Sequence, residues 1–507
     1  AFIIANHNHM KPTNLLALGA IMTTSIFAGC GSHSEKLSYP AAPQDGTVDT
    51  VFGMEVIDTY RPLENDTSAE TARWVEAENA LTQEYLSKIP YRDRIRERLT
   101  GLSDYVKRGL PWRGEDGRWY FFENDGLRNQ SVLYRAKDAA GTDREVFLDP
   151  NTLSDDGTVA LTGVYQSKDG RHTAYTISRS GSDWTEIYVM DTETGELTGD
   201  HIEWAKFTGA SWDGDGFYYS AYPRPEAGKE YSHANENHIV YYHKLGTPQS
   251  ADVIAFSDPS QPLHFHTAGV AESEPVTFVS IGGEGIGEAL KVKKNGVWVD
   301  MVKDQDYTNG VIDVIGGKAY ILTSYGAPKN RIMVADINGN PSREAWIELV
   351  PEADAVLTGA QFSGDNLYLT YEKDAASKIE IWSRDGKKLS DIALPGYGDV
   401  SLSLSRKHPE DVFYAFTSFN SPSAIYSYNP ATGESVRIFE PEVKGINLDD
   451  YVTEQVFYPS ADGTKIPMFL TYKKGLKRDG NNPVYLYGYG GFNISLTPGF
   501  SPYRMFM

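Results

Sequence analysis

The chain has 507 residues, enough for about three domains or for one large and one small domain. Hydrophobic residues make up 40% and aromatic residues 12%, which argues against a disordered chain. The 69 acidic and 47 basic residues give a net charge of −22, which argues against a nucleic-acid-binding protein and fits an anionic lipid surface poorly. The charge serves solubility or, alternatively, produces a field that favours cationic substrates.

The first thirty residues have the layout of an export signal. Residues 10–30 begin with Met10 and Lys11, continue with an apolar stretch of about 15 residues, and end with small residues before Cys30. A cysteine after "FAG" resembles a bacterial lipoprotein signal, in which Cys30 would become the lipidated first residue. Ordinary signal cleavage and a buried N-terminal helix are the alternatives. We expect residues 1–29 to be upstream sequence and signal peptide, and the protein to be exported to the periplasm, with lipid anchoring through Cys30 as one outcome.

Two helices are predicted before residue 104. The stretch "SAETARWVEAENALTQEYLSKI" repeats apolar residues, including Val75 and Leu81, near the 3.6-residue period. Ser68 is a candidate N-cap and Pro90 a stop signal. A second helix is expected over "RDRIRERLTGL" at 92–102.

From residue 105 to 448 the pattern is one of short strands separated by turn signals such as Asp116-Gly117 and Asp385-Gly386. The predicted strands cover 118–124, 130–136, 145–149, 172–178, 185–191, 216–222, 238–245, 274–280, 318–324, 331–336, 366–372, 378–383, 411–417 and 424–429. At roughly 45–50 residues per four-stranded unit, this region makes about seven units, which favours a seven-bladed β-propeller. A pair of β-sandwiches is the alternative.

The last residues, 449–507, differ again. A hairpin is predicted around Asp462-Gly463, followed by the apolar run "NPVYLYGYGGF" at 482–492. A continuous apolar strand indicates a sheet buried on both faces, as in α/β folds.

Several catalytic motifs are missing from the sequence. The 507 residues contain no G-x-S-x-G, no P-loop and no Rossmann fingerprint, since "GGEGIGEAL" at 282–290 has the wrong spacing. His264 and His266 lie two residues apart, so they would share one face of a strand. Further ligands are not apparent, so we expect a surface or packed strand here and no metal site.

The motif "YGYGGF" carries the clearest chemistry. Paired glycines directly after an apolar strand occur where an α/β-hydrolase places the loop that supplies its oxyanion hole. Gly490 and Gly491 would let the backbone approach a reacting carbonyl closely. The Tyr489 phenol stays protonated at neutral pH and can donate. One such donor is worth about 3–4 kcal/mol in the transition state. A plain tight turn is the alternative.

Long segments of the chain resemble the prolyl oligopeptidase (prolyl endopeptidase) family of serine peptidases. They include "DTYRPLEN" at 58–65, "WVEAENALTQEYL" at 74–86, "VFYPSADGTKIPMFLTYKKGLK" at 456–477 and "YGYGGFNISLTP" at 487–498. The resemblance implies a seven-bladed propeller that caps a split α/β-hydrolase domain. The N-terminal helical segment of that domain would be 30–104, the propeller 105–448, and its first C-terminal strands 449–507.

The resemblance also implies roles for four residues. Tyr489 matches the oxyanion tyrosine, Phe492 an aromatic residue of the pocket for the substrate proline, and Phe207 a propeller residue of the next subsite outward. Phe265 would lie beside Phe207. The alternative for Phe492 and Phe207 is that they are core aromatic residues.

The family implies cleavage of short peptides after proline by triad acyl transfer, with the propeller as a size filter and with no cofactor. A monomer is expected. None of the 507 residues can be assigned to the serine, aspartate and histidine of the triad, which would lie beyond Met507. We therefore expect a C-terminally truncated, inactive fragment of a bacterial peptidase. Alternatives are an oligopeptidase specific for basic residues and a non-catalytic propeller lipoprotein that binds ligands or partners.

Overall fold

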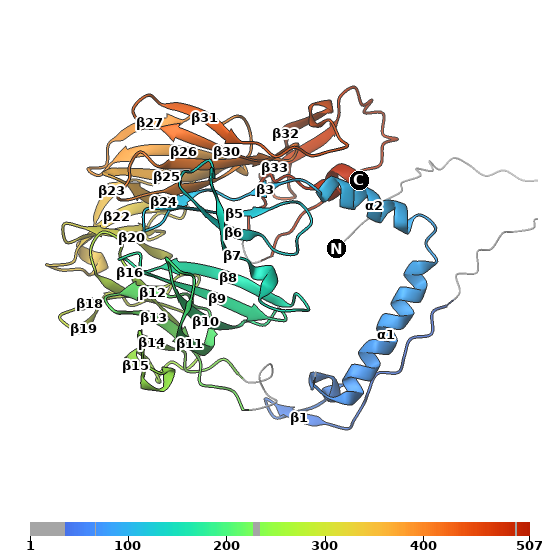
Figure 1. The fold of residues 1–507 in the computed structure, drawn as a ribbon, viewed down its shortest axis with the longest axis horizontal. Coiled ribbons are helices and arrows are strands. Elements are labelled where there is room, and N and C mark those ends of the chain that lie inside the picture. Colours follow the sequence, from blue (N-terminus) through green and yellow to red (C-terminus); the bar gives the residue numbers. More distant parts are fainter. Residues whose placement is uncertain (1–35, 66, 227–233, 492–493) are drawn as a thin grey trace, which may run out of the picture. The chain divides into compact units, whose positions relative to one another are not determined.

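The computed structural model describes residues 36–65, 67–226, 234–491 and 494–507 (Figure 1). These residues fall into two compact units, which we describe separately. The helical unit contains residues 36–96, 226 and 477–489, and the sheet unit contains 97–225, 234–476 and 490–507.

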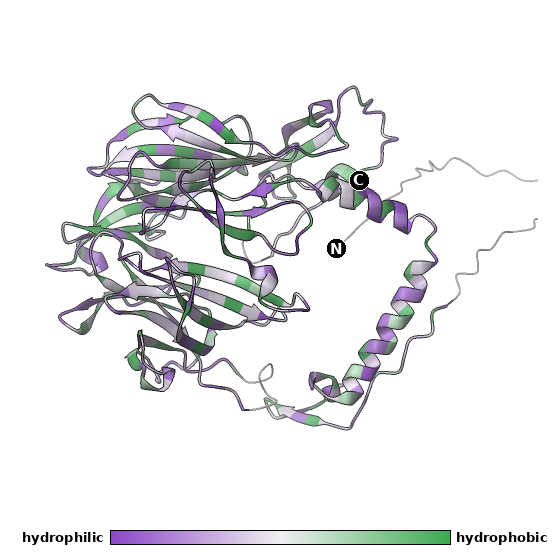
Figure 2. Cartoon of the chain, viewed as in Figure 1, coloured by the Kyte–Doolittle hydropathy of each residue, from purple (hydrophilic) through white to green (hydrophobic). Residues whose placement is uncertain are grey.

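The helical unit begins with a small hairpin and continues with a long helix. Its elements are β1 (Val48–Val51), β2 (Met54–Ile57), the 3₁₀ helix η1 (Arg61–Glu64) and α1 (Ala69–Ser87). The Ser68 hydroxyl accepts a hydrogen bond of 3.0 Å from the Thr71 amide, so the predicted N-cap is confirmed. In α1 only Thr71 is buried, and Val75 is 44% exposed. The predicted apolar stripe of α1 is therefore not covered within this unit, and Figure 2 shows hydrophobic and hydrophilic residues along the whole helix.

The second predicted helix is α2 (Arg92–Ser103), which runs from the helical unit into the sheet unit. Leu102 near its C-terminal end is 1% exposed. Short 3₁₀ helices are η2 (Pro150–Thr152), η3 (Gln249–Ala251), η4 (Arg343–Ala345) and η5 (Leu448–Asp450).

In the sheet unit, strands β4 to β31 of the described ranges divide into seven antiparallel groups of four, which we call blades 1 to 7; blades 2 and 3 are continuous, because β11 pairs with β13 at Ala205 and Ala221. Blade 1 contains β4 (Trp112–Arg113), β5 (Trp119–Asn124), β6 (Val132–Ala136) and β7 (Glu145–Leu148), and β3 (Lys107–Arg108) also pairs with β5. Blade 2 contains β8 (Val159–Gln166), β9 (His172–Arg179), β10 (Trp184–Asp191) and β11 (Leu197–Lys206). Blade 3 contains β12 (Ser211–Asp213), β13 (Gly216–Ala221), β14 (Ile239–Lys244) and β15 (Val253–Phe256).

The remaining blades follow the same order along the chain (Figure 1). Blade 4 contains β16 (Phe265–Val270), β17 (Thr277–Gly282), β18 (Ala289–Lys294) and β19 (Val297–Val302). Blade 5 contains β20 (Asn309–Ile315), β21 (Lys318–Thr323), β22 (Arg331–Asp336) and β23 (Ile347–Val350). Blade 6 contains β24 (Val356–Ser363), β25 (Asn366–Lys373), β26 (Ala376–Ser383) and β27 (Lys388–Ile392). Blade 7 contains β28 (Asp399–Leu404), β29 (Val412–Ser418), β30 (Ser421–Asn429) and β31 (Glu434–Phe439).

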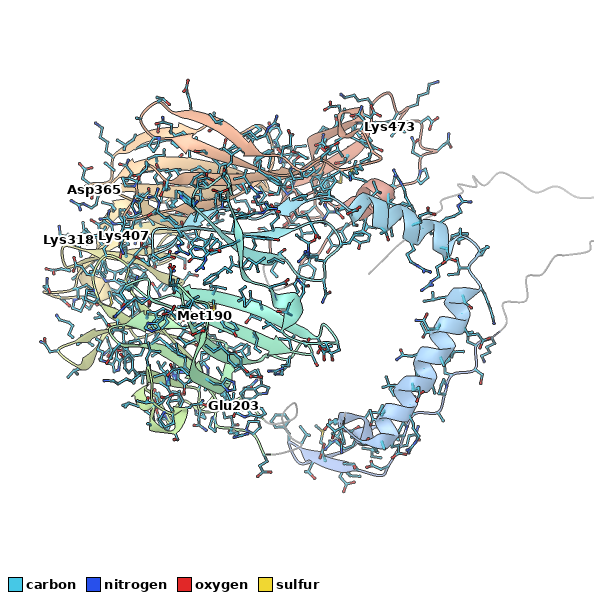
Figure 3. All side chains as sticks on the ribbon, viewed as in Figure 1. Met190, Glu203, Lys318, Asp365, Lys407 and Lys473 are labelled. Atoms are coloured by element: carbon cyan, nitrogen blue, oxygen red, sulfur yellow. The ribbon has the colours of Figure 1, made fainter. Side chains whose placement is uncertain are left out.

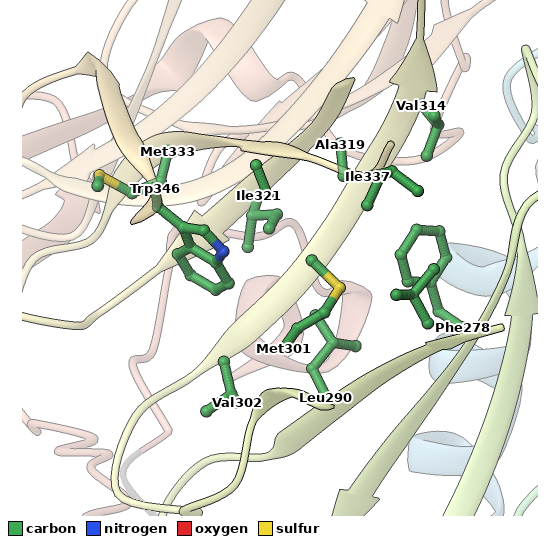
Figure 4. Close-up of a cluster of buried hydrophobic side chains, with 12 residues drawn as sticks. Phe278, Leu290, Met301, Val302, Val314, Ala319, Ile321, Met333, Ile337 and Trp346 are labelled. Carbon is green, nitrogen blue, oxygen red and sulfur yellow. The ribbon is translucent and has the colours of Figure 1, made fainter. Parts of the chain in front are cut away.

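Each blade packs on the next through its own hydrophobic cluster. The cluster between blades 4 and 5, which includes Phe278, Leu290, Ile321 and Trp346, shows how side chains from both sheets interdigitate (Figure 4). Corresponding clusters join the other neighbouring blades. This succession of packed four-stranded sheets is a β-propeller, and the alternative of two sandwiches is wrong.

Blades 1 and 7 meet through side chains. Trp119 and Phe413 share a buried cluster, with their rings edge-to-face at 5.4 Å between centroids. Arg113 Nε lies 2.8 Å from Asp411 Oδ2, and the Ser403 hydroxyl donates a 2.7 Å hydrogen bond to the Pro111 carbonyl. Within the described residues no strand pairs these two blades. Side-chain packing therefore closes the ring.

After blade 7 the chain forms the predicted hairpin, β32 (Tyr451–Pro459) with β33 (Lys465–Lys473), and ends with the short helix α3 (Pro502–Phe506). The strand expected within 482–492 is not formed. Val484 is 79% and Leu486 74% exposed, and the described residues offer no partner strand for this segment. A strand requires backbone partners, so the apolar run stays without secondary structure here.

Candidate functional site

Phe207 directly follows β11, the strand on which Figure 3 labels Glu203. The pairing of β10 with β11 shifts register, so β11 carries a bulge before Phe207. Phe207 has φ of +52° and its side chain is 51% exposed. A positive φ at a bulky residue costs on the order of 1–3 kcal/mol and persists only when its surroundings hold it. The structure therefore presents this phenyl ring at the surface of the sheet unit rather than in its core.

Two neighbours hold the Phe207 ring. Tyr222 contacts it edge-to-face, with the ring centroids 6.4 Å apart. Lys206 Nζ lies 5.3 Å from the Phe207 centroid and 4.7 Å from that of Trp184, and it donates a 3.1 Å hydrogen bond to Asn235 Oδ1. Burial raises the pKa of the Tyr222 phenol, so this ring is neutral at pH 7.

Phe265 is the first residue of β16 and is 42% exposed. It pairs with Gly282 on β17. A Cβ at position 282 would meet the Phe265 ring at 2.6 Å, so the glycine makes room for the ring. Phe265, like Phe207, presents an aromatic face to solvent from a fixed backbone position.

Sequence reasoning did not identify the group that connects the two phenylalanines. His238, just before β14, is 1% exposed and hydrogen-bonds the carbonyl of Lys206 and the amide of His266. Burial lowers the pKa of His238 to about 4, so its imidazole is neutral at pH 7. The stretch "ENHIVYYHKL", which contains His238 and His243, gives no signal of such a role for His238, because both of its partners are backbone atoms distant in sequence.

Tyr489 belongs to the helical unit and is 53% exposed. Gly490, the next residue, has φ of +93°, a conformation that glycine adopts without strain. A Cβ at position 490 would meet nothing within 4 Å, so the backbone is accessible there. Phe492 and Cys30 lie outside the described residues.

Met507, the last residue of the sequence, directly follows α3 and is 77% exposed. Its amide donates a 3.0 Å hydrogen bond to the Tyr503 carbonyl, which is a contact of the helix end. A thioether has no proton to give and is only a weak acceptor, so Met507 itself supplies no group for acyl transfer. The expectation that the triad residues lie beyond Met507 stays a prediction.

Potential metal ligands are engaged in other contacts. His264 and His266 are 8% and 1% exposed, so both side chains are packed, but only His266 is part of a strand, β16, because His264 directly precedes it. Among the described residues one group, His408, Glu410 and Asp411, brings ligand atoms within 4.8 Å of one another. The Asp411 carboxylate is already paired with Arg113 at the junction of blades 1 and 7.

Comparisons with known proteins identify the fold. The profile described as "Prolyl oligopeptidase, N-terminal beta-propeller domain" matches residues 39–440. The prolyl endopeptidase of Elizabethkingia meningoseptica is 40% identical over 487 residues, which are 95% of this chain and 68% of that protein. The chain belongs to the prolyl oligopeptidase family. Its relatives in Elizabethkingia are named prolyl endopeptidases, which are serine peptidases, so the protein is a peptidase of the prolyl oligopeptidase type.

More distant members of the family agree. The prolyl endopeptidase of Dictyostelium discoideum is 32% identical, and the match covers 92% of this chain and 71% of that protein. Among solved structures, prolyl oligopeptidase B of Galerina marginata, bound to a 35mer hydrolysis and macrocyclization substrate, superposes with a TM-score of 0.81 at 29% identity. That match covers 92% of this chain and 69% of the other.

Proposed function

We propose that the protein is an endopeptidase that cleaves short peptides on the C-terminal side of proline. The observation that carries this proposal is the 40% identity to a prolyl endopeptidase over 95% of the chain. In the reaction a serine hydroxyl gives its proton to a general base and its oxygen attacks the carbonyl carbon of the proline residue, whose carbonyl oxygen becomes an oxyanion. Collapse of this tetrahedral intermediate expels the amine, and water then hydrolyses the acyl-enzyme. We assign no metal or organic cofactor to this chemistry.

Tyr489 is the residue to which we assign oxyanion stabilisation. Its phenol would donate a hydrogen bond to the developing negative charge, a contribution of about 3–4 kcal/mol. The exposed phenol and the adjacent Gly490, with its positive φ, support this role, because donor and backbone are both accessible. We assign Phe492 to the pocket for the substrate proline.

Phe207 and Phe265 are proposed to contact the peptide on the N-terminal side of the proline. Both rings are about half exposed and are held by structured neighbours, which limits the entropy lost on binding. The propeller is proposed to act as a filter that admits short peptides only.

The test uses protein produced from the complete gene and a chromogenic peptide with the chromophore after proline. Tyr489→Phe is expected to lower kcat by about 10²–10³-fold. Tyr485→Phe is the matched control, since Tyr485 is another exposed tyrosine of the same segment, and its rate is expected to stay at that of the wild type. An unchanged rate in Tyr489→Phe would rule out the oxyanion role. Cleavage after Lys or Arg would identify the alternative specificity for basic residues.

The 507 residues contain no G-x-S-x-G sequence. That they hydrolyse no peptide by themselves stays a prediction, which an assay of residues 30–507 with the same substrate tests. A measurable rate from this chain would contradict it.

We further propose export to the periplasm, supported by the signal-like residues 10–30. In the part of the chain that the structure describes, no helix is long and apolar enough to cross a membrane. Incorporation of labelled palmitate in bacterial cells, lost in Cys30→Ser, would support a lipid anchor. Release of unlabelled protein into the periplasm would favour ordinary signal cleavage.

A further inference from the structure

The His238 ring joins two segments that are distant in sequence. Its Nε2 lies 3.0 Å from the carbonyl oxygen of Lys206, and the His266 amide donates a 2.9 Å hydrogen bond to its Nδ1. Because Nδ1 accepts, the proton of the neutral ring is on Nε2, which donates to Lys206. One buried side chain therefore fixes the backbone directly before Phe207 and directly after Phe265.

A second buried group makes a parallel connection. The Ser220 hydroxyl donates a 2.8 Å hydrogen bond to the His266 carbonyl, and the Ser220 amide donates a 2.8 Å bond to Thr208 Oγ1. Ser220, on β13, is 1% exposed. The residues on both sides of Phe207, and the residue after Phe265, are thus bonded by two residues of blade 3, His238 through its ring and Ser220 through its hydroxyl and its amide.

The bond to His266 is made at the edge of a sheet. β16 is the first strand of its sheet and, among the described residues, pairs with β17 alone. His266 returns a bond through its own ring, whose Nδ1 lies 2.6 Å from the His238 carbonyl. Separating the two segments would leave buried polar groups without hydrogen bonds. The cost of these unsatisfied groups keeps the segments together.

His238 also supports the Phe207 ring through a neighbour. The His238 and Tyr222 rings lie 4.4 Å apart, and Tyr222 in turn contacts Phe207 edge-to-face. The strained backbone at Phe207 requires such support, because a positive φ at phenylalanine relaxes when its surroundings loosen.

We infer that His238 is a positioning residue for peptide recognition, which sets Phe207 and Phe265 at a fixed separation to bind the residues N-terminal to the substrate proline. Ser220 assists it from the same blade. The inference rests on the proposed function, in which these two aromatic side chains contact the peptide.

Two substitutions separate the bonds of His238. His238→Gln places an amide N–H near the position of Nε2 and retains the donor to Lys206, whereas His238→Asn places a carbonyl near Nδ1 and retains the acceptor for His266. The control is His243→Asn, at the other end of β14. His243 is also fully buried, but it bonds the side chains of Asp200 and Asp252 instead.

Kinetics on protein from the complete gene use two substrates. One has three residues before the proline, and in the other the N-blocked proline is the first residue, so that no residue reaches Phe207 or Phe265. Loss of one positioning bond is expected to raise KM for the longer substrate by about three- to tenfold, with kcat and the shorter substrate unchanged. The control is expected to lower thermal stability without changing the ratio of the two KM values.

The outcomes distinguish the two proposals. If the wild type cleaves neither substrate after proline, the proposed function fails. If it cleaves both and the His238 variants leave the KM ratio unchanged, or change kcat for both substrates equally, the positioning role is wrong.

Hydrogen exchange tests the inference without an activity assay, so it can also be applied to variants that fold poorly. Hydrogen exchange at the His266 amide is expected to be slow in the wild type and in Ser220→Ala, and faster in His238→Gln. Fast exchange at this amide in the wild type would overturn the inference, because the amide would then not be held by its bond to the His238 ring.

Discussion

Closure of the propeller between blades 1 and 7 depends on side chains, and Phe413 tests this directly. Phe413 is 6% exposed, so Phe413→Ala loses nearly the whole burial of the ring and leaves a cavity beside Trp119. Substitutions of this kind cost about 3–5 kcal/mol, of which roughly 0.5–1.5 kcal/mol comes from the edge-to-face contact. That is a large part of the stability of about 5–15 kcal/mol typical of a folded domain.

The matched control is Phe362→Ala at the junction of blades 5 and 6. Phe362 is also 6% exposed and contacts Tyr320 edge-to-face at 4.9 Å. Both variants are expected to lose similar free energy in urea unfolding. Blades 5 and 6 are consecutive in the chain, whereas blades 1 and 7 are joined only by side chains in the described structure.

Hydrogen–deuterium exchange therefore separates the two variants. Phe413→Ala is expected to accelerate exchange in β5 and β29, through an opening whose free energy is well below that of global unfolding. Phe362→Ala is expected to leave these two strands protected. The claim that packing closes the ring would be refuted if Phe413→Ala lowered the free energy of unfolding by less than about 1 kcal/mol. Equal opening of β5 and β29 in both variants would also refute it.

Two further predictions concern stability. Burial lowers the pKa of His238 to about 4, and Tyr222, His266 and the Lys206 carbonyl surround its ring. Between about pH 6.5 and pH 4 this histidine is therefore protonated in the unfolded chain and neutral in the native chain. Stability should fall as the pH decreases from about 6.5 to 4, by roughly 3 kcal/mol in total, and this part should disappear in His238→Gln; equal pH profiles in urea unfolding would contradict it. Ser68→Ala removes the N-cap of α1 and should cost about 1 kcal/mol, measured as lost exchange protection in the first turn of the helix, whereas no loss there would contradict the cap.

The sequence predicted the central strands of the blades except β18, and of the inner and outer strands it predicted β7 alone. The fourteen predicted segments correspond to β5–β7 and to pairs such as β9–β10, β21–β22 and β25–β26. These strands contain buried apolar residues: β21, for example, has the consecutive buried residues Ala319, Tyr320 and Ile321. The outer strands β27 ("KLSDI") and β31 ("ESVRIF") are mostly exposed, so their composition is that of a loop. Their strand structure comes from pairing with a neighbour, which local patterns do not encode.

The candidate site was also predicted only in part from the sequence. The motif "YGYGGF" and the match around Phe207 pointed to residues with recognisable side chains, and the exposed Phe207 and Phe265 rings are compatible with those predictions. The strand predicted around Tyr485 is not formed, and among the described residues no strand pairs with this segment. His238 could not be found from the sequence because its function lies in bonds to backbone atoms on two other blades.

The most direct test of the account is the position of the cut. Protein from the complete gene is incubated with a mixture of short peptides that contain proline, lysine and arginine at internal positions, and the products are mapped by mass spectrometry. We predict new C-termini at proline in the short peptides, and intact chains when the same sequences are placed in a folded protein. New C-termini at lysine or arginine, or equal cleavage of the folded protein, would contradict the proposed specificity and size selection.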